Sequence, residues 1–361
     1  MKAIVFERHG GPEVLELRDL PEPRPGPQEV LIEVRASGVN PNGYWARLGV
    51  NGRTFPLPMI PGSDAAGVVR EVGDHVNNVQ VGDEVVVYCG ISCRKCFRCV
   101  NGEEHVCERN GGFKIWGFDT GPYQGAHAEY VTIHEHNVVP KPARLGWEEA
   151  ASLPLTLVTA WHMLVTNARL EANDVVLVRG SAGGLGGMAT QIAKVRGAIV
   201  IAVASNETKA AFSKEMGADE VVIRPRTHGA DGVEVSKAFL KRIAELSAKY
   251  ARRGVDVVFD HVGGDTVMES VRALRHGGVM VTCGATSGYQ THVELANLFV
   301  HNKSIMGSTL GSKAELVQAM RCVERGQIRS RVTEILPLAE CGRAQEMLRT
   351  GSAVGKVVLS R

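Results

Sequence analysis

The sequence has almost no net charge, no long apolar run and no internal repeat or low-complexity tract. Its 41 lysines and arginines stand against 39 acidic residues, a formal net charge of +2, which argues against a nucleic-acid partner. No apolar stretch approaches the length of a membrane span, and the apolar run after Lys2 is too short for a signal peptide. We therefore expect a cytoplasmic protein without a membrane partner. At 361 residues, two domains are expected.

Glycine is abundant, and one cluster of it organises the second half of the chain. A β-branched run from Val175 ends at Gly180, continues as Ser-Ala-Gly-Gly-Leu-Gly-Gly and passes into apolar residues at helical spacing from Met188. This pattern predicts a strand, a tight turn and a helix whose free N–H groups hold a pyrophosphate. Alternation with helical patterns predicts a Rossmann fold, a doubly wound parallel sheet, with further strands at 198–204, 220–223, 255–260 and 278–283.

The first part of the chain has a different pattern. Short runs of alternating apolar and polar residues are separated by proline-rich segments and Gly-Asp turns, which predicts a small antiparallel β-barrel. After residue 300 the chain is expected to return to this barrel through a helix over 312–325 and a closing strand at 355–359. The barrel strands are expected at 2–6, 14–18, 29–35, 65–72, 83–88 and 128–133.

Four of the eight cysteines lie within one short segment. Cys93, Cys96 and Cys99 are spaced by three residues, and Cys107 follows eight residues later. Thiolates at this spacing can close a tetrahedral Cys₄ site, the closed coordination of a structural zinc. Free or disulfide-paired cysteines are the alternative that the spacing leaves open. The other cysteines stand alone and are expected to be small core residues, namely Cys89, Cys283, Cys322 and Cys341.

Two further segments, 36–49 and 61–64, complete a resemblance to a known family. Together with the order of the domains and the cysteine segment, they make the chain similar to the medium-chain dehydrogenase/reductase family over nearly its whole length. The resemblance implies an α/β protein with two domains. These are a GroES-like antiparallel β-barrel domain at 1–145 and 300–361, with a structural-zinc lobe at 89–110, and a Rossmann dinucleotide-binding domain at 146–299.

The chain departs from the zinc alcohol dehydrogenases of that family at the catalytic metal. Asn40 stands where those enzymes have a cysteine ligand, Ser63 replaces a histidine, and Leu155 occupies the third ligand position. These side chains do not supply the nitrogen and sulfur ligands that a catalytic zinc needs, and Asp64 alone is insufficient. We expect one structural zinc per chain and no catalytic metal.

The segment after the second predicted Rossmann strand favours NADPH. An NAD site usually has an acid about 20 residues past the glycine cluster, but Ser205 stands there. Lys209 and Arg224 lie close by in the predicted fold and would attract a 2′-phosphate. In the alternative interpretation both are solvated surface charges and Glu207 serves the ribose. The other expected cofactor contacts, including one implied by the resemblance at Thr159, are Ser181, Ala182, Gly183, Gly184, Leu185, Gly186, Val262, Gly284 and Ala285.

These features together predict an NADPH-dependent enzyme that reduces a polarised C=C bond or a quinone in a small molecule. The enolate oxygen that forms must then meet hydrogen-bond donors instead of a metal. Asn40, Asn42, Tyr44 and Trp45 line the loop that replaces the metal site, and we expect Asn42 and Tyr44 to orient the substrate, with the proton from Tyr44 or water. Alternatively, these residues only fill space. The resemblance also implies a homodimer or homotetramer.

Three other functions remain open at this point. One is a zinc alcohol dehydrogenase with an unusual ligand set, and another is an NADPH-binding protein without turnover, since fold does not settle function. The third rests on a partial likeness to crotonyl-CoA carboxylase/reductases, which implies reductive carboxylation of an enoyl thioester. In those relatives the matching residues help to hold carbon dioxide, and here they are Asn42, Phe118, Asp119 and a histidine such as His292.

Overall fold

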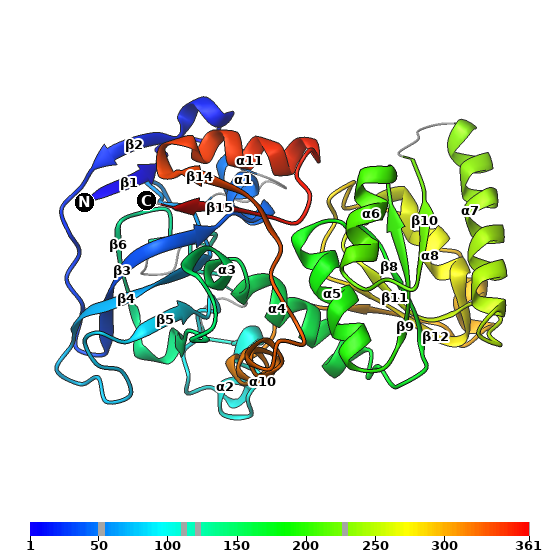
Figure 1. The fold of residues 1–361 in the computed structure, drawn as a ribbon, viewed down its shortest axis with the longest axis horizontal. Coiled ribbons are helices and arrows are strands. Elements are labelled where there is room, and N and C mark those ends of the chain that lie inside the picture. The colour runs from blue at the N-terminus through cyan, green and yellow to red at the C-terminus, as the bar shows by residue number, and fades with distance from the viewer. Residues whose placement is uncertain (50–54, 110–113, 120–123, 226–229, 361) are drawn as a thin grey trace. The chain divides into compact units, whose positions relative to one another are not determined.

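The computed structural model describes residues 1–49, 55–109, 114–119, 124–225 and 230–360. The chain divides into two compact units, the first formed by Met1–Val158 with Gly311–Arg361 and the second by Thr159–Leu310. The first unit is therefore interrupted in sequence by the second, as the colours of Figure 1 show. The limits expected from the sequence are 145/146 and 299/300, and the two units divide at 158/159 and 310/311.

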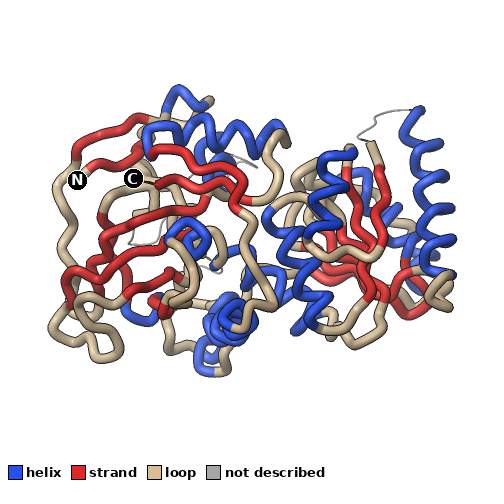
Figure 2. Tube along the Cα trace, viewed as in Figure 1, coloured by secondary structure: helices blue, strands red, loops and turns tan. Residues whose placement is uncertain are grey.

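The second unit contains a six-stranded sheet in the order β10-β9-β8-β11-β12-β13. Every neighbouring pair is parallel, and the chain winds outward in both directions from β8, the order of a doubly wound Rossmann sheet. β8 is fully buried because helices cover both faces of the sheet, as Figure 2 shows. The strands are β8 (Val175–Val178), β9 (Ile199–Ala204), β10 (Glu220–Ile223), β11 (Val255–Asp260), β12 (Leu274–Thr282) and β13 (Ser304–Gly307).

Amphipathic helices connect these strands. Phe239, Ile243 and Leu246 of the longest helix pack into the core between helix and sheet, as their spacing predicts. Val235, which follows the same spacing in the sequence, lies outside the residues whose side chains the structure describes. The helices of this unit are α5 (Gly184–Val195), α6 (Glu207–Glu215), α7 (Ala230–Ala248), α8 (Val267–Ala273) and α9 (Leu295–Phe299).

The first unit is built on a sheet in the order β14-β15-β3-β4-β5-β7, with β6 also paired to β3 and with β1 and β2 as a separate pair. This sheet differs from the expected antiparallel barrel in two respects. β14 and β15 are parallel, and the described strands follow an open path whose end strands do not pair. The strands are β1 (Lys2–Val5), β2 (Glu16–Asp19), β3 (Glu29–Gly38), β4 (Asp64–Val72), β5 (Glu84–Val87), β6 (Tyr130–His134), β7 (Val138–Pro140), β14 (Val332–Pro337) and β15 (Lys356–Ser360).

Short helices join the strands of this unit. α1 (Pro41–Leu48) lies where the sequence predicts a loop. It starts with a proline at its first position and ends at Gly49, whose φ of 67° is left-handed. Two of these helices follow each other closely, because a proline at 154 starts a new helix three residues after Ala151 ends the one before it. The remaining ones are α2 (Phe97–Val100), α3 (Trp147–Ala151), α4 (Pro154–Trp161, which runs into the second unit), α10 (Lys313–Glu324) and α11 (Cys341–Thr350).

The closing strand brings a distant part of the sequence to the first helix. β15 pairs antiparallel with β3, with Val358 opposite Gly38 and Ser360 opposite Ala36. Lys356, the first residue of β15, therefore lies beside the start of α1, which follows β3. Among the described helices, none has the length and apolar character needed to cross a membrane.

Candidate functional site

A closed cluster of three polar side chains lies where β15, β4 and α1 meet. The ammonium of Lys356 donates to Asn40 Oδ1 at 2.7 Å and to Asp64 Oδ2 at 3.5 Å, and Asn40 Nδ2 donates to the same Asp64 oxygen at 2.7 Å. The side chains of Lys356 and Asp64 are 4% and 0% exposed. Each buried charge therefore faces its opposite, as burial requires. The sequence reasoning missed Lys356, whose one signal was a basic residue at the start of an apolar strand.

The cluster also fixes the beginnings of two helices. Asn40 is the residue that precedes α1, and the backbone N–H of Leu155, in the first turn of α4, donates to Asp64 Oδ1 at 2.8 Å. An N–H in the first turn of a helix has no partner within the helix, so this carboxylate satisfies it. Burial raises the pKa of Asp64 and lowers the pKa of Lys356, and their mutual attraction opposes both shifts.

The predicted catalytic residues gather on α1. Asn42 Nδ2 donates to Ser63 Oγ at 2.6 Å, and both residues are buried. Tyr44 and Trp45 pack edge to face, with ring centroids 5.6 Å apart. The structure thus brings Asn40 and Asn42 to the two motif residues of β4 and its preceding turn, while Tyr44 and Trp45 form a pair of their own.

A buried, neutral histidine, His127, packs against the residues that precede β4. Nδ1 of His127 is 2.9 Å from Ser37 Oγ, and burial, reinforced by the positive charge of Lys356, lowers the pKa of His127 to about 3. Gly62 packs on the imidazole ring, where a Cβ on residue 62 would lie 2.7 Å from His127 Nδ1. The φ of Gly62 is 107°, a backbone conformation that favours glycine. The glycine before Ser63 is therefore required by its own backbone and by the imidazole.

The four thiols of the cysteine segment have the separations of a tetrahedral zinc site. The four Sγ atoms lie within 4.8 Å of one another, and three of the separations are 3.5, 3.9 and 4.0 Å. A tetrahedral zinc with Zn–S bonds of about 2.3 Å separates its sulfurs by about 3.8 Å. Backbone N–H groups point to two of the thiols, Cys93 and Cys107, and such donors orient the ligands of a metal. The residues fit a zinc ion, with Cys93, Cys96, Cys99 and Cys107 as its ligands.

The positions of the catalytic ligands do not fit a second zinc. In the part of the chain that the structure describes, the cysteine cluster is the one group of three or more potential ligands placed to hold a metal. Asp64 already pairs with the ammonium of Lys356, and the neighbouring Asn40 and Ser63 offer neutral oxygen and amide groups. Of the solitary cysteines, Cys89, Cys322 and Cys341 are buried as expected and Cys283 is half-buried.

The glycine cluster forms a turn that admits no side chain at two positions. Gly180 has a φ of 61°, and a Cβ there would lie 2.8 Å from the ring of His261; a Cβ on Gly186 would lie 2.3 Å from the carbonyl oxygen of Gly180. α5 begins directly after Gly183, so the amides of its first turn face the open end of the helix. This cradle fits a pyrophosphate, with donors at Gly184, Leu185 and Gly186.

The hydroxyl of Ser181 makes hydrogen bonds within the second unit. It donates to the carbonyl of Val203 at 2.9 Å and lies 2.7 Å from the hydroxyl of Ser213. This side chain therefore ties the turn to β9 and α6. Ala182, the next residue of the turn, is also buried.

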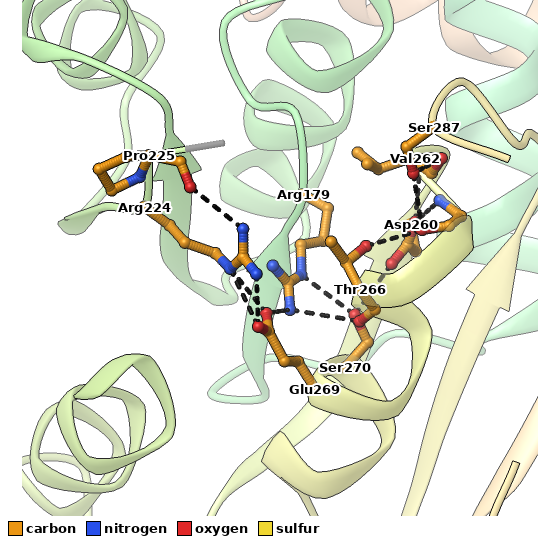
Figure 3. A network of polar contacts seen from close by, with 10 residues as sticks. Arg179, Arg224, Pro225, Asp260, Val262, Thr266, Glu269, Ser270 and Ser287 are labelled. Atoms are coloured by element: carbon orange, nitrogen blue, oxygen red, sulfur yellow. Dashed lines mark hydrogen bonds and ion pairs between the residues drawn. The ribbon is translucent and has the colours of Figure 1, made fainter. Parts of the chain in front are cut away.

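The residues expected at the 2′-phosphate are brought to one edge of the sheet. The backbone N–H of Arg224 donates to the carbonyl of Ala204 at 2.8 Å, which places Arg224 beside Ser205. Asn206 caps α6 by accepting the N–H of Lys209 at 3.0 Å. The guanidinium of Arg224 is 12% exposed and pairs with a carboxylate of α8, as Figure 3 shows. Arg224 is therefore not a solvated surface charge.

The loops after β11 and β12 pack against each other. Asp260 Oδ1 accepts the N–H groups of Val262 and Gly263 at 2.7 and 3.0 Å, and Ser287 Oγ donates to the carbonyl of Val262 at 2.9 Å. A Cβ on Gly263 would lie 2.8 Å from Cα of Ala285. Val262, Gly284 and Ala285 are thus on neighbouring loops at the carboxyl edge of the sheet, where a Rossmann ligand binds. Thr159 is buried in α4.

The structure gives the following contacts for the residues implied by the likeness to carboxylating reductases. Asp119 accepts the N–H of Ile115 at 3.0 Å, and Phe118 packs on Phe55 in the core beside α1, with ring centroids 5.1 Å apart and ring planes tilted by 49°. His292 is exposed and belongs to the second unit.

Comparison with known proteins matches both parts of the chain to dehydrogenase domains. An alcohol dehydrogenase GroES-like domain family matches residues 26–143, and a zinc-binding dehydrogenase family matches residues 184–325. A crotonyl-CoA reductase of Streptomyces avermitilis is 34% identical over 369 residues, which cover 95% of this chain and 81% of that protein.

Solved structures agree over the full length. The crystal structure of an NAD-dependent alcohol dehydrogenase matches with a TM-score of 0.91 and 39% identity and covers 100% of both chains. A variant of the crotonyl-CoA carboxylase/reductase AntE in complex with NADP matches with a TM-score of 0.89 and 29% identity, covering 100% of this chain and 94% of that one. By its sequence and its fold, the chain belongs to the medium-chain dehydrogenase/reductase family of oxidoreductases.

Proposed function

We propose that this protein is an NADPH-dependent oxidoreductase that reduces a polarised C=C bond, in an enone or enoyl thioester, or a quinone, without a catalytic metal. The observation that carries the proposal is the Lys356–Asp64–Asn40 cluster. It places an internal ammonium, fully hydrogen-bonded, among the residues that match the catalytic-zinc motif. The acidic ligand position is thereby neutralised from within the chain.

Bound NADPH would supply the hydride, and the chain's own residues would bind, orient and protonate. The open amides of α5 hold the pyrophosphate. Asn42 and Tyr44 on α1 orient the substrate oxygen on which negative charge develops, and Tyr44 or water delivers the proton. Both polar ends of Asn40 are engaged by Asp64 and Lys356, so we assign Asn40 to positioning α1 and not to substrate contact.

The preference for NADPH rests on the edge beside β9. Ser205 supplies no carboxylate to repel a phosphate, and the forked guanidinium of Arg224 is anchored next to it. A related crotonyl-CoA carboxylase/reductase has been solved with NADP. We extend this cofactor to the present chain.

One screen tests the proposal. Consumption of NADPH is measured with small enones, quinones, enoyl thioesters and aldehydes, with NADH as the matched cofactor control and with bicarbonate added or withheld for the thioesters. Reduction of an enone, thioester or quinone, faster with NADPH and independent of added metal, is the expected result. Product mass that rises with bicarbonate would assign reductive carboxylation instead, and alcohol oxidation by a protein with two zinc ions per chain would refute the metal-free mechanism.

Variants in α1 separate chemistry from binding. Tyr44→Phe removes one hydroxyl, and Asn42→Ala removes the amide. Both are expected to lower kcat by about tenfold or more, since each lost donor to a developing charge costs several kcal/mol at most. Unchanged turnover in the double variant would remove the assignment, and retained NADPH affinity serves as the control for folding.

We also propose a homodimer formed through β13. This strand is the outer strand of its sheet among the described residues, and all four of its residues are exposed. Leu295 and Phe299 of the adjacent α9 are 70% and 71% exposed, which makes an apolar rim beside an open strand edge. Light scattering should show two chains, and Phe299→Asp should shift the mass toward one.

A further inference from the structure

A single carboxylate lies between two arginines at the edge of the Rossmann sheet. Glu269 of α8 accepts from Arg224 Nε at 2.8 Å and from Arg224 Nη2 at 2.5 Å, and it accepts from Arg179 Nη2 at 2.8 Å. Figure 3 shows the two guanidiniums converging on this side chain, from Arg179 directly after β8 and from Arg224 directly after β10. Burial alone would raise the pKa of Glu269, but the two arginines outweigh burial and hold it below the usual range.

The pairing uses one particular edge of the Arg224 guanidinium. Nε and Nη2 face Glu269, and Nη1 donates to the carbonyl of Pro225 at 3.2 Å. A guanidinium carries five N–H groups, so among the described residues one N–H remains on each terminal nitrogen. These two form the end-on edge, which binds phosphate oxygens in bidentate fashion. Glu269 therefore holds the guanidinium by its side and leaves its phosphate-binding edge available.

Hydrogen bonds also connect Arg179 to the loop that follows β11. Arg179 Nε donates to Ser270 Oγ at 3.1 Å, and Ser270 Oγ donates to Asp260 Oδ2 at 2.9 Å. The other oxygen of Asp260 holds the backbone of Val262, as described above. Arg179 is buried, and its guanidinium carbon is 4.4 Å from the ring centroid of Phe239, so this anchor has little freedom to move.

We propose that Glu269 is a specificity-determining positioning residue, which presents Arg224 to the 2′-phosphate of NADPH by holding the guanidinium side-on against Arg179. The inference rests on the proposed NADPH preference. It adds that discrimination between NADPH and NADH depends on a carboxylate of α8 that acts through Arg224. A positive charge beside Ser205 is by itself insufficient.

Two variants test this role. Glu269→Gln keeps the shape of the side chain but gives up one acceptor oxygen and the charge, and Arg224→Lys keeps the charge but has no fork to span carboxylate and phosphate. We expect each to lower the ratio of NADPH to NADH affinity by about three- to tenfold, the effect of releasing one ordered side chain. Binding is measured by nucleotide fluorescence, and adenosine 2′,5′-bisphosphate against AMP repeats the comparison without the nicotinamide.

The double variant and a matched control complete the test. In an Arg224→Lys background, Glu269→Gln is expected to change the ratio no further. Glu294→Gln is the matched control. It breaks the exposed ion pair between Glu294 and Arg272, which lies in α8 like Glu269, and it should leave the ratio unchanged. Arg224→Lys leaves the Glu269–Arg179 pair intact, so it remains informative if Glu269→Gln does not fold.

The outcomes are distinct. An unchanged ratio in Arg224→Lys or Glu269→Gln overturns the inference, as does a further loss in the double variant. A higher ratio in Glu269→Gln also overturns it, since Glu269 would then compete with the phosphate. If the unaltered protein already binds NADH as well as NADPH, the proposed cofactor preference fails, and that result is known before any variant is made.

Discussion

Two regions of the first unit show opposite ways of placing positive charge in the same scaffold. The lobe of residues 93–107 brings four thiols within 4.8 Å of one another, an arrangement that fits a metal ion. The cluster of Asn40, Asp64 and Lys356 instead has its cation attached to the chain as an ammonium.

The two regions differ in where the charge that balances their acidic groups comes from. Thiolates need an external cation, because four negative sulfurs are unstable alone. One carboxylate needs a single positive charge, and a lysine from an adjacent strand supplies it. A metal can be removed and replaced from solution, whereas Lys356 can be removed only by mutation.

The largest expected effect is loss of the lobe. Cys107→Ser removes a fully buried ligand, so zinc should be lost and the melting temperature should fall strongly, because structural zinc in small peptides contributes about 10–16 kcal/mol of binding free energy. Metal analysis should give one zinc per chain before the change and less than one after it. Cys322→Ala, outside the lobe, is the control that keeps the metal. A variant that retains its zinc would show that the lobe is not the metal site.

Breaking the second region should cost less. Lys356→Met leaves the Asp64 carboxylate buried without its cation, which should lower the free energy of unfolding by about 3–5 kcal/mol. Adding Asp64→Asn should recover part of this loss, since no buried charge is then unpaired. Urea unfolding of the two single variants and the double variant measures the coupling. Strictly additive losses would contradict a direct pair.

The stability of the protein in acid should depend on the buried His127. The folded pKa of His127 is lowered to about 3, below the unfolded value of 6.5, so the folded state favours the neutral ring. The stabilisation is fully present above pH 6.5 and is lost as pH falls toward 3, by about 1.4 kcal/mol per pH unit. His127→Gln should flatten part of this dependence of the unfolding free energy, whereas His75→Gln on the surface should not. Parallel curves for all three proteins would refute the assignment.

The smallest expected effect is at the hydroxyl of Ser63. Ser63→Ala removes the acceptor of the buried Asn42 amide, which should lower the free energy of unfolding by about 1 kcal/mol. Turnover should fall a few-fold while the affinity for NADPH stays constant, because Asn42 loses its orientation and the second unit is unaltered. An equal loss in turnover and in NADPH affinity would indicate a general structural defect.

The sequence predicted best what depends on local pattern. The glycine turn, the strands around it and the spacing of the cysteines are each written within a few residues, and the structure has all of them. α1 is not among the predicted helices, because its residues match the loop that carries a metal ligand in the zinc enzymes, although a proline at its start and Gly49 at its end are helix signals.

Long-range pairings escaped prediction. The parallel pairing of β14 with β15 differs from the expected antiparallel barrel, and no local pattern in 332–337 indicates it. Arg224 was found by its position, but its partner Glu269 lies 45 residues further on, in a helix whose contacts depend on the folded sheet. Lys356 lies 316 residues from Asn40, so the local sequence around either residue does not predict the contact.

That last separation has a consequence for biosynthesis. A ribosome adds about 5–20 residues per second, so Asn40 and Asp64 emerge roughly 15–60 s before Lys356 is made. During this interval the whole of the second unit, Thr159–Leu310, can fold, while the buried carboxylate of the first unit still lacks its cation. The nascent polypeptide should therefore acquire its nucleotide pocket early and its α1 site only when β15 is added. A fusion or truncation that disturbs this strand would leave a protein that binds dinucleotide but does not turn over.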